Sequence, residues 1–574
     1  MSWKTFGNAA VVGALFAIVA TACAPSTPAA GTAAPSPAGS AVGAPVRGGT
    51  LVVAIWQEPA NLMPSYQSQT VQSVVLDTVV EGLLRATPAG EYEPVLAKAV
   101  PTVTNGGVKV SADGKTMDVT YQLLPGIKWS DGEPVTSADV KFTWQAWMTD
   151  PKVGTREGYD QISSIDTPDD LTAVVHYKAI YGPYPTRFGR LLAKHALEKE
   201  SDYSKSDYVR KPLGTGPFKV TQFNAGESFV VERNPYYRVA GKPYLDKIIF
   251  KSVPSSTVAI AQLKAGEVQA MWNIGEAETA DVANDPNIAV VVTPSPYDER
   301  IEMNTAVNKD GTDANSVHPV LGDINVRRAL IYATPKQQII DKLLLGKAQV
   351  GRTVLSIGWA APKDITQEGY DPKKANDLLD KAGWAKGSDG IRSKGGVRAA
   401  LTISTTSGNA YREQLEQVLI DEYKQVGVDL KIQNYPSSVF LSGSWATGDQ
   451  RKRGSYDLSL YNSAPDIDPQ SIVNQRYHSK NIPSPANGGV GQNYTRVKNA
   501  EMDKAIDEAG ASLDFEARKA AYARALKILN DQAVIIWLSE RTDLTAYRKN
   551  VQGQGPGNGW RNFAHNTEEW WLSK

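Results

Sequence analysis

A single cysteine, Cys23, occurs among the 574 residues of the chain, so no intramolecular disulfide can stabilise its fold. The fold must therefore depend on a hydrophobic core, and a chain of this length can form about two to four domains with large cores. The 61 basic and 61 acidic side chains balance, which argues against a nucleic-acid partner or a polybasic membrane patch.

The segment around Cys23 has the pattern of an export signal. Lys4 precedes the apolar run AAVVGALFAIVA at residues 9–20, which is too short to span a bilayer but suits a secretory signal peptide. The sequence ATAC, which ends at Cys23, resembles a bacterial lipobox, in which the thiol is acylated and the chain is cut before the cysteine. We therefore predict a lipoprotein signal peptide over residues 1–22, with an ordinary signal peptide cut near Ala22 as the alternative.

Residues 23–47 have the composition of a flexible tether. Between residues 24 and 46 the chain carries no charge and no bulky apolar side chain except two valines, so it cannot bury enough surface to offset chain entropy. A coil of this length spans about 25 to 30 Å. The pattern predicts a globular body held outside the cytoplasm by a lipid anchor at Cys23.

Strand and helix patterns alternate along the rest of the chain, and we find no internal repeat. We expect strands over residues 48–56, 116–123, 428–435 and 456–462, where apolar residues are continuous or alternate. Helical spacing and capping residues predict helices over residues 70–84, from Thr136 and Asp139, from Thr334 and Pro335, from Asp371 to Gly383, and over 515–531. The pattern indicates an α/β fold with mixed sheets.

A search for catalytic and metal-binding patterns returns almost nothing. The five histidines show no metal-ligand spacing, and the chain has no nucleophile elbow, phosphate-binding loop or dinucleotide-binding fingerprint. Asp466 and Asp468 form a bare D-x-D pair, which is weak evidence for a metal. The sequence therefore predicts a binding protein with no metal and no cofactor, and not an enzyme.

Four segments, in this order, resemble the family 5 extracellular solute-binding proteins, the dipeptide- and oligopeptide-binding proteins of ABC importers. They are residues 126–148, 214–237, 323–346 and 518–538, and the resemblance extends from about Gly48 to the C-terminus. It implies a periplasmic-binding-protein-like α/β fold (class II, cluster C) with two main lobes, a ligand cleft and an extra accessory domain. The implied boundaries are residues 48–90, 213–305 and 545–574 for lobe I, 91–212 for the accessory domain and 306–544 for lobe II.

The resemblance also implies a function. The protein is expected to be a monomeric solute-binding lipoprotein that captures a peptide and delivers it to the permease subunits of an ABC importer. Tethering beside the permease would raise its local concentration there, which explains Cys23. An oligosaccharide or another polar solute is the alternative ligand, and a non-transport surface receptor is the alternative role. A secreted hydrolase is disfavoured because the nucleophile and metal patterns are missing.

The most family-like motif, residues 126–142, needs no ligand to explain it. Glycines suit its turns, Trp129 is expected to pack in a core, and Thr136 with Asp139 forms a capping box. The resemblance places this motif in the accessory domain.

We expect the ligand to contact two other places. One is Trp272, which follows a predicted strand. The other is the end of the strand over 456–462 and its following loop, where the peptide-binding relatives place a carboxylate for the α-amino group of the ligand. Counting forward from Tyr456 places that acid at Asp466, whereas counting back from Asp468 places Pro465 there and loses the acid. The candidate ligand-binding residues are Asp466, Trp272, Tyr461, Asn462, Trp445 and Asp468.

Overall fold

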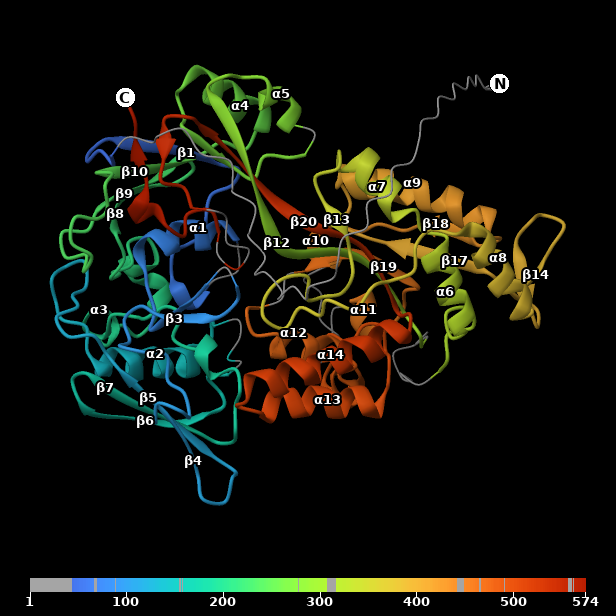
Figure 1. Ribbon diagram of the computed structural model, residues 1–574, viewed down its shortest axis with the longest axis horizontal. Coiled ribbons are helices and arrows are strands. Elements are labelled where there is room, and N and C mark those ends of the chain that lie inside the picture. The colour runs from blue at the N-terminus through green and yellow to red at the C-terminus, as the bar shows by residue number, and fades with distance from the viewer. Residues whose placement is uncertain are drawn as a thin grey trace, which may run out of the picture. The chain divides into compact units, whose positions relative to one another are not determined.

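A computed structural model describes residues 44–66, 70–87, 89–153, 156, 158–276, 278–306, 316–440, 449–463, 466–489, 491–555, 560 and 562–574 (Figure 1). The predicted signal peptide, Cys23 and Trp445 lie outside the described residues. Within the described residues, no helix is long and apolar enough to cross a membrane.

The largest sheet among the described residues has 11 strands in the order β18-β17-β19-β12-β20-β11-β1-β10-β9-β8, with β13 paired to β20 at the side. Parallel and antiparallel neighbours are mixed, as the pattern predicted. Its strands are β1 Thr50–Ile55, β8 Phe218–Asn224, β9 Ser228–Arg233, β10 Lys247–Ser252, β11 Ala270–Trp272, β12 Ile288–Met303, β13 Gln349–Val350, β17 Ala400–Ser404, β18 Asp429–Ile432, β19 Leu458–Ser463 and β20 Ile535–Arg548.

Four smaller sheets accompany the large one in the described ranges. The four-stranded sheet has the order β4-β5-β7-β6, β2 pairs with β3, β21 pairs with β22, and β14, β15 and β16 form a small sheet. The bounds are β2 Leu84–Ala86, β3 Tyr92–Pro94, β4 Val108–Val110, β5 Met117–Gln122, β6 Ile162–Asp169, β7 Thr172–Tyr177, β14 Ala385–Lys386, β15 Arg392–Lys394, β16 Val397–Arg398, β21 Val551–Gln552 and β22 Trp571–Leu572.

Helices lie between the strands along the chain. The α-helices are α1 Thr70–Val79, α2 Ser137–Thr149, α3 Lys194–Leu197, α4 Ser256–Ala265, α5 Thr279–Ala283, α6 Ile324–Tyr332, α7 Lys336–Leu343, α8 Pro372–Lys381, α9 Ala410–Gln425, α10 Ser437–Phe440, α11 Gln450–Arg453, α12 Gln470–Tyr477, α13 Ala500–Ala511 and α14 Phe515–Asp531. Short 3₁₀ helices are η1 Pro64–Tyr66, η2 Tyr184–Thr186, η3 Tyr203–Lys205, η4 Asp207–Val209, η5 Ser479–Asn481, η6 Pro485–Asn487 and η7 Thr567–Glu569.

The strands β12 and β20 are common to both ends of the large sheet (Figure 1). They pair with each other over most of their length, while β11 pairs with residues 545–547 of β20 and β19 pairs with residues 298–303 of β12. Their register shifts between Pro294 and Asp298, which face Thr542 and Glu540. Residues 295–297 therefore bulge opposite Arg541, at the point where the sheet passes from one end to the other.

Apolar side chains form several clusters instead of one core. One cluster draws on residues between 63 and 208 and includes the four-stranded sheet and α2; we call it the 63–208 cluster. Others lie beside the β1–β8 end of the large sheet, beside β17 and β19, and around α13 and α14. The predicted boundaries of the lobes and the accessory domain stay a prediction.

Two predicted helix boundaries are wrong. The helix expected over residues 70–84 ends at Val79. The chain then passes Gly82, where a Cβ would lie 2.2 Å from the carbonyl carbon of Gly189, and enters β2 at Leu84. The helix expected to begin at Thr334 begins at Lys336, after Pro335. The Thr334 hydroxyl instead donates to the carbonyl oxygen of Leu330, 2.7 Å away, and so closes α6.

The predicted structural role of Trp129 agrees with its surroundings. Its side chain is 0% exposed in the 63–208 cluster, and its indole nitrogen donates to a carboxylate oxygen of Asp139 at 3.4 Å. Asp139 also accepts from the backbone nitrogens of Thr136 (2.9 Å) and Lys194 (2.8 Å), and the predicted capping box is present. Burial raises the pKa of this carboxyl, while its hydrogen bonds lower it.

Replacing Trp129 with alanine should lower the free energy of unfolding by about 3 to 5 kcal/mol, because it removes a fully buried indole and an Asp139 donor together. Denaturant unfolding followed by circular dichroism measures this change. Trp56, which is 42% exposed, supplies the matched control, since W56A should cost far less. Equal losses in the two variants would contradict a core role for Trp129.

Candidate functional site

A cavity of about 1100 Å³ opens beside the bulge of β12. Its wall combines residues of β12 and β20 at the bulge with residues of α1, of the β2–β3 hairpin, of the loop after β19 and of the C-terminal segment. The α1 residues recur at helical spacing, so one face of this helix forms part of the wall. They are Thr70, Ser73 and Asp77, followed by Val80 and Glu81 just after the helix.

Most charged groups on one side of the cavity are paired within the protein. Asp77 accepts hydrogen bonds from Arg190 and Asn562, each at 2.6 Å, and so joins α1 to two distant segments. Glu81 pairs with Arg238 at 2.5 Å, and Arg85 pairs with Glu93.

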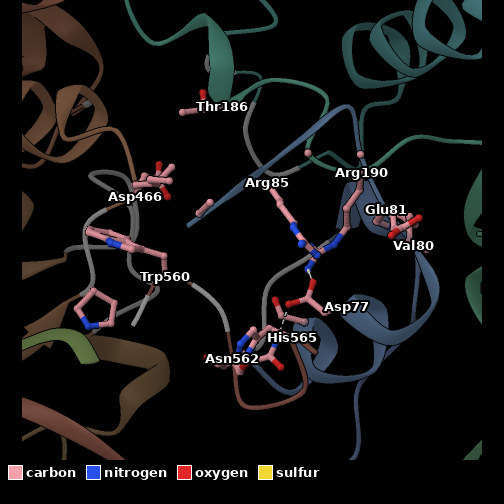
Figure 2. A pocket seen from close by; sticks show the side chains of 18 of the residues that line it. Asp77, Val80, Glu81, Arg85, Thr186, Arg190, Asp466, Trp560, Asn562 and His565 are labelled. Atoms are coloured by element: carbon pink, nitrogen blue, oxygen red, sulfur yellow. Dashed lines mark hydrogen bonds and ion pairs between the residues drawn. The ribbon is translucent and has the colours of Figure 1, made fainter. Parts of the chain in front are cut away.

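Figure 2 shows Arg85, Arg190 and Asp77 on one side of the cavity, with Asp466 and Trp560 on the other. The two arginine side chains point toward one another, next to the Asp77 carboxylate. Because Arg190 and Asp77 are paired, this side of the wall is largely neutralised without a ligand.

Aromatic side chains cover much of the remaining wall. Among them, the Trp56 side chain is exposed to solvent, with 42% of its surface accessible. Trp272 is 7% exposed and stacks on Phe563, with ring centroids 5.9 Å apart. The other aromatic residues of the wall are Tyr92, Trp147, Tyr159, Tyr297 and Trp560. Such a wall can hold apolar groups and still offer hydrogen bonds.

The hydroxyl of Tyr92 stands out among these groups. It is buried and has no hydrogen-bond partner in the described part of the chain. Burial raises the pKa of this phenol well above its ordinary value, so the group stays neutral and can donate or accept a hydrogen bond.

Three of the residues predicted to bind the ligand lie on the cavity wall: Trp272, Asn462 and Asp466. Trp272 ends β11 and Asn462 is on β19, where it faces Glu299 of β12. Asp466 is exposed to solvent, and one of its carboxylate oxygens accepts from the Ser471 hydroxyl at 2.8 Å.

Tyr461 and Asp468 do not belong to the cavity wall. Tyr461 is buried. The guanidinium groups of Arg300 and Arg451 lie 4.7 and 5.1 Å from the centroid of its ring, and its hydroxyl accepts from Arg476. Asp468 is 2% exposed and makes a bidentate pair with Arg518, both distances being 2.7 Å. These contacts hold the two side chains inside the protein.

Several wall residues were not found from the sequence: Trp56, Asp77, Arg190, Arg541, Asp543 and Trp560. For α1, the signal was present, since Thr70, Ser73 and Asp77 recur at helical spacing and form a polar stripe. For Arg541, no signal existed, because the bulge that places it depends on pairing with β12, some 250 residues earlier.

The arrangement can bind a ligand with both polar and apolar groups. In the described ranges, no group of three or more His, Cys, Asp or Glu side chains is placed to hold a metal ion. The wall residues offer a ligand hydrogen bonds, charges and aromatic contacts.

Solved structures of several bacterial proteins share this fold. The oligopeptide-binding protein AppA of Bacillus subtilis, solved in complex with a nonapeptide, superposes with a TM-score of 0.70 over 92% of this chain and 100% of that one, at 25% identity. NikZ of Campylobacter jejuni, solved in complex with Ni(L-His), gives a TM-score of 0.72 at 26% identity, over 91% and 99% of the two chains. The predicted fold class is confirmed: a periplasmic-binding-protein-like α/β fold.

Sequence comparison gives the same answer. AppA is 25% identical over 554 residues, 94% of each chain. A Brucella ovis protein, named as a candidate ABC transporter peptide-binding protein, is 30% identical over 423 residues, 72% of this chain and 74% of its own. The sequence model of the bacterial extracellular solute-binding proteins, family 5, matches residues 91–484, more than half of the chain. The protein therefore belongs to the family 5 bacterial extracellular solute-binding proteins.

Proposed function

We propose that the protein captures a peptide outside the cytoplasm and delivers it to the permease of an ABC importer. The observation that carries this proposal is the cavity at the β12–β20 bulge, which combines aromatic wall residues with isolated polar groups in a solute-binding family. The names of AppA and of the Brucella protein, and the nonapeptide in the AppA structure, support peptide as the ligand class. Membership of a family of solute-binding proteins supports a binding role over a catalytic one.

An oligosaccharide or another polar solute is the alternative ligand. The exposed ring of Trp56 on the wall favours it, because indole rings also stack on sugars. Native mass spectrometry of the protein purified from its own host would distinguish the two ligand classes, since peptides and sugars differ in elemental composition and therefore in accurate mass. Recovery of sugars alone would contradict the peptide proposal.

We infer that binding closes the cavity by a hinge at the bulge, where β12 and β20 leave strict register. Backbone contacts at glycines support this inference. The Gly182 nitrogen donates to the carbonyl oxygen of Gly510 in α13 at 3.1 Å. Gly90 of the β2–β3 turn approaches Gly358 closely, since a Cβ at Gly90 would lie 2.9 Å from the Gly358 Cα.

Gly182 is required by this contact and not by its own backbone. Its φ lies outside the left-handed region, and the three atoms nearest to an added Cβ belong to Ser512 (2.5 Å) and Arg518 (2.9 and 3.0 Å). The neighbouring Tyr184 packs in the 63–208 cluster, and Leu513 packs against that cluster from the other side of the contact. An added methyl group would therefore push the segment around Gly182 away from Ser512 and Arg518.

Replacing Gly182 with alanine should weaken ligand binding at least about tenfold, because the closed form becomes less populated. Gly369, which has open space around its Cα and no left-handed φ, gives the matched control G369A. Calorimetry measures affinity, and small-angle scattering measures compaction on binding. Wild-type affinity and compaction in G182A would contradict the role of this contact.

Asp466 is our candidate partner for the α-ammonium group of the peptide. It lies on the cavity wall, and its carboxylate has a single hydrogen bond, from Ser471, among the described residues. A ligand ammonium group enclosed in the cavity needs an anionic partner, because an unpaired buried charge costs several kcal/mol.

Replacing Asp466 with asparagine should weaken peptide binding by about 30-fold or more, and N-acetylated peptides should bind the wild type equally poorly. Calorimetry with free and acetylated peptides measures both effects, and D364N, an exposed carboxylate away from the cavity, is the control. If acetylation weakens binding to D466N as much as to the wild type, Asp466 is not the ammonium partner.

We also propose that the protein is a lipoprotein anchored through Cys23, as the lipobox-like ATAC and the tether indicate. Replacing Cys23 with serine should block acylation, because it removes the thiol that carries the acyl group. Without its acyl chains, the protein should leave the membrane fraction. Fractionation of cells that express each form, with immunoblotting, tests this. Equal membrane retention of both forms would refute the lipid anchor.

A further inference from the structure

Arg541 lies at the centre of the hinge region and faces the cavity. It is opposite the bulge of β12, between the register pairs Pro294–Thr542 and Asp298–Glu540. Side chains alternate along a strand: Arg541 and Asp543 line the cavity, whereas the Thr542 hydroxyl donates to the Lys347 carbonyl oxygen and Glu540 pairs with Arg352.

The other arginines of the cavity wall have partners within the protein. Arg190 pairs with Asp77 and Arg85 with Glu93. Arg187 bonds to the Thr186 hydroxyl and lies over the Tyr159 ring, 5.5 Å from its centroid. In the described part of the chain, Arg541 makes no hydrogen bond and no ion pair. It is therefore the wall arginine that keeps its full hydrogen-bonding capacity for a ligand.

Asp543 does not neutralise Arg541 through an ion pair. The two carry opposite charges on the same face of β20, but no ion pair joins them among the described residues. Burial raises the pKa of the Asp543 carboxyl, while the Arg541 charge and a hydrogen bond from Ser295 lower it.

A guanidinium group enclosed with a ligand needs an anion of matching shape. Carboxylates meet that need, because two parallel N–H donors of arginine fit the two carboxylate oxygens. We propose that Arg541 binds a carboxylate of the peptide at the hinge, so that the protein selects ligands that carry a free carboxylate group. This inference rests on the proposed function and deepens it: with Asp466 at the ammonium group, the preferred ligand is a zwitterion.

Peptide libraries test the proposal without a known ligand. Three equimolar tetrapeptide libraries serve as probes: one with free C-terminal carboxylates, one C-terminally amidated, and one amidated with a glutamate in each peptide. Native mass spectrometry and competition calorimetry measure capture by the wild type, R541Q and R541K. R524Q, which removes an exposed arginine of α14, is the control for the loss of one positive charge.

The wild type should bind the acid library about 30-fold or more tightly than the plain amidated library, and R541Q should bind both equally weakly. R541K should be intermediate, because it keeps the charge but loses the planar fork. R524Q should behave as the wild type.

The glutamate library identifies the source of the carboxylate. If the glutamate restores wild-type binding and R541Q abolishes that gain, a side-chain carboxylate occupies Arg541; if only free C-termini bind tightly, the C-terminal group does. An amidation penalty that is the same in R541Q as in the wild type, with no glutamate gain, would overturn the inference while the proposed function stands. Absence of wild-type binding to all three libraries would overturn both.

Discussion

The strands β12 and β20 pair with each other and also pair with the strands at the two ends of the large sheet. Every other strand of that sheet is therefore positioned, directly or through neighbours, by this one antiparallel pair. The register shift opposite Arg541 is a local loss of ladder hydrogen bonds in the middle of the pair. It gives the sheet a place to bend, and the cavity lies beside it.

Buried charges anchor β12 where it enters the β19 side of the sheet. Arg300 pairs with Asp298 at 2.5 Å and with Glu302 at 3.0 Å, and Glu299 pairs with Arg412 at 2.6 Å. Arg300 and its two partners lie on β12 itself, whereas Glu299 joins β12 to Arg412 of α9, so a register slip of one residue would move Glu299 to the opposite face and away from Arg412. Because an unpaired buried charge is costly, the Glu299–Arg412 pair favours this register of β12, although a second register shift lies between Glu299 and Arg300.

In the candidate site, too, most charged side chains are paired within the protein. The wall neutralises Asp77, Glu81 and Arg85 through partners in the protein, which leaves Arg541, the Tyr92 hydroxyl and one side of Asp466 for a ligand. Asp466 and Asp468 are only two residues apart, yet Asp468 is held by Arg518 while Asp466 faces solvent. The partner, and not the residue type, decides which carboxylate can contact a ligand.

The sequence by itself determined the α/β class, the capping box at Thr136, the buried place of Trp129, the strands near β1, β5, β18 and β19, and the family, because these depend on local periodicity, capping and ordered motifs. It also placed Trp272, Asn462 and Asp466, which line the cavity. Only the tertiary structure decided that the Tyr461 and Asp468 side chains turn inward, and that Arg541 and Asp77 line the same cavity. Those outcomes depend on pairing between segments up to hundreds of residues apart, which a local pattern does not encode.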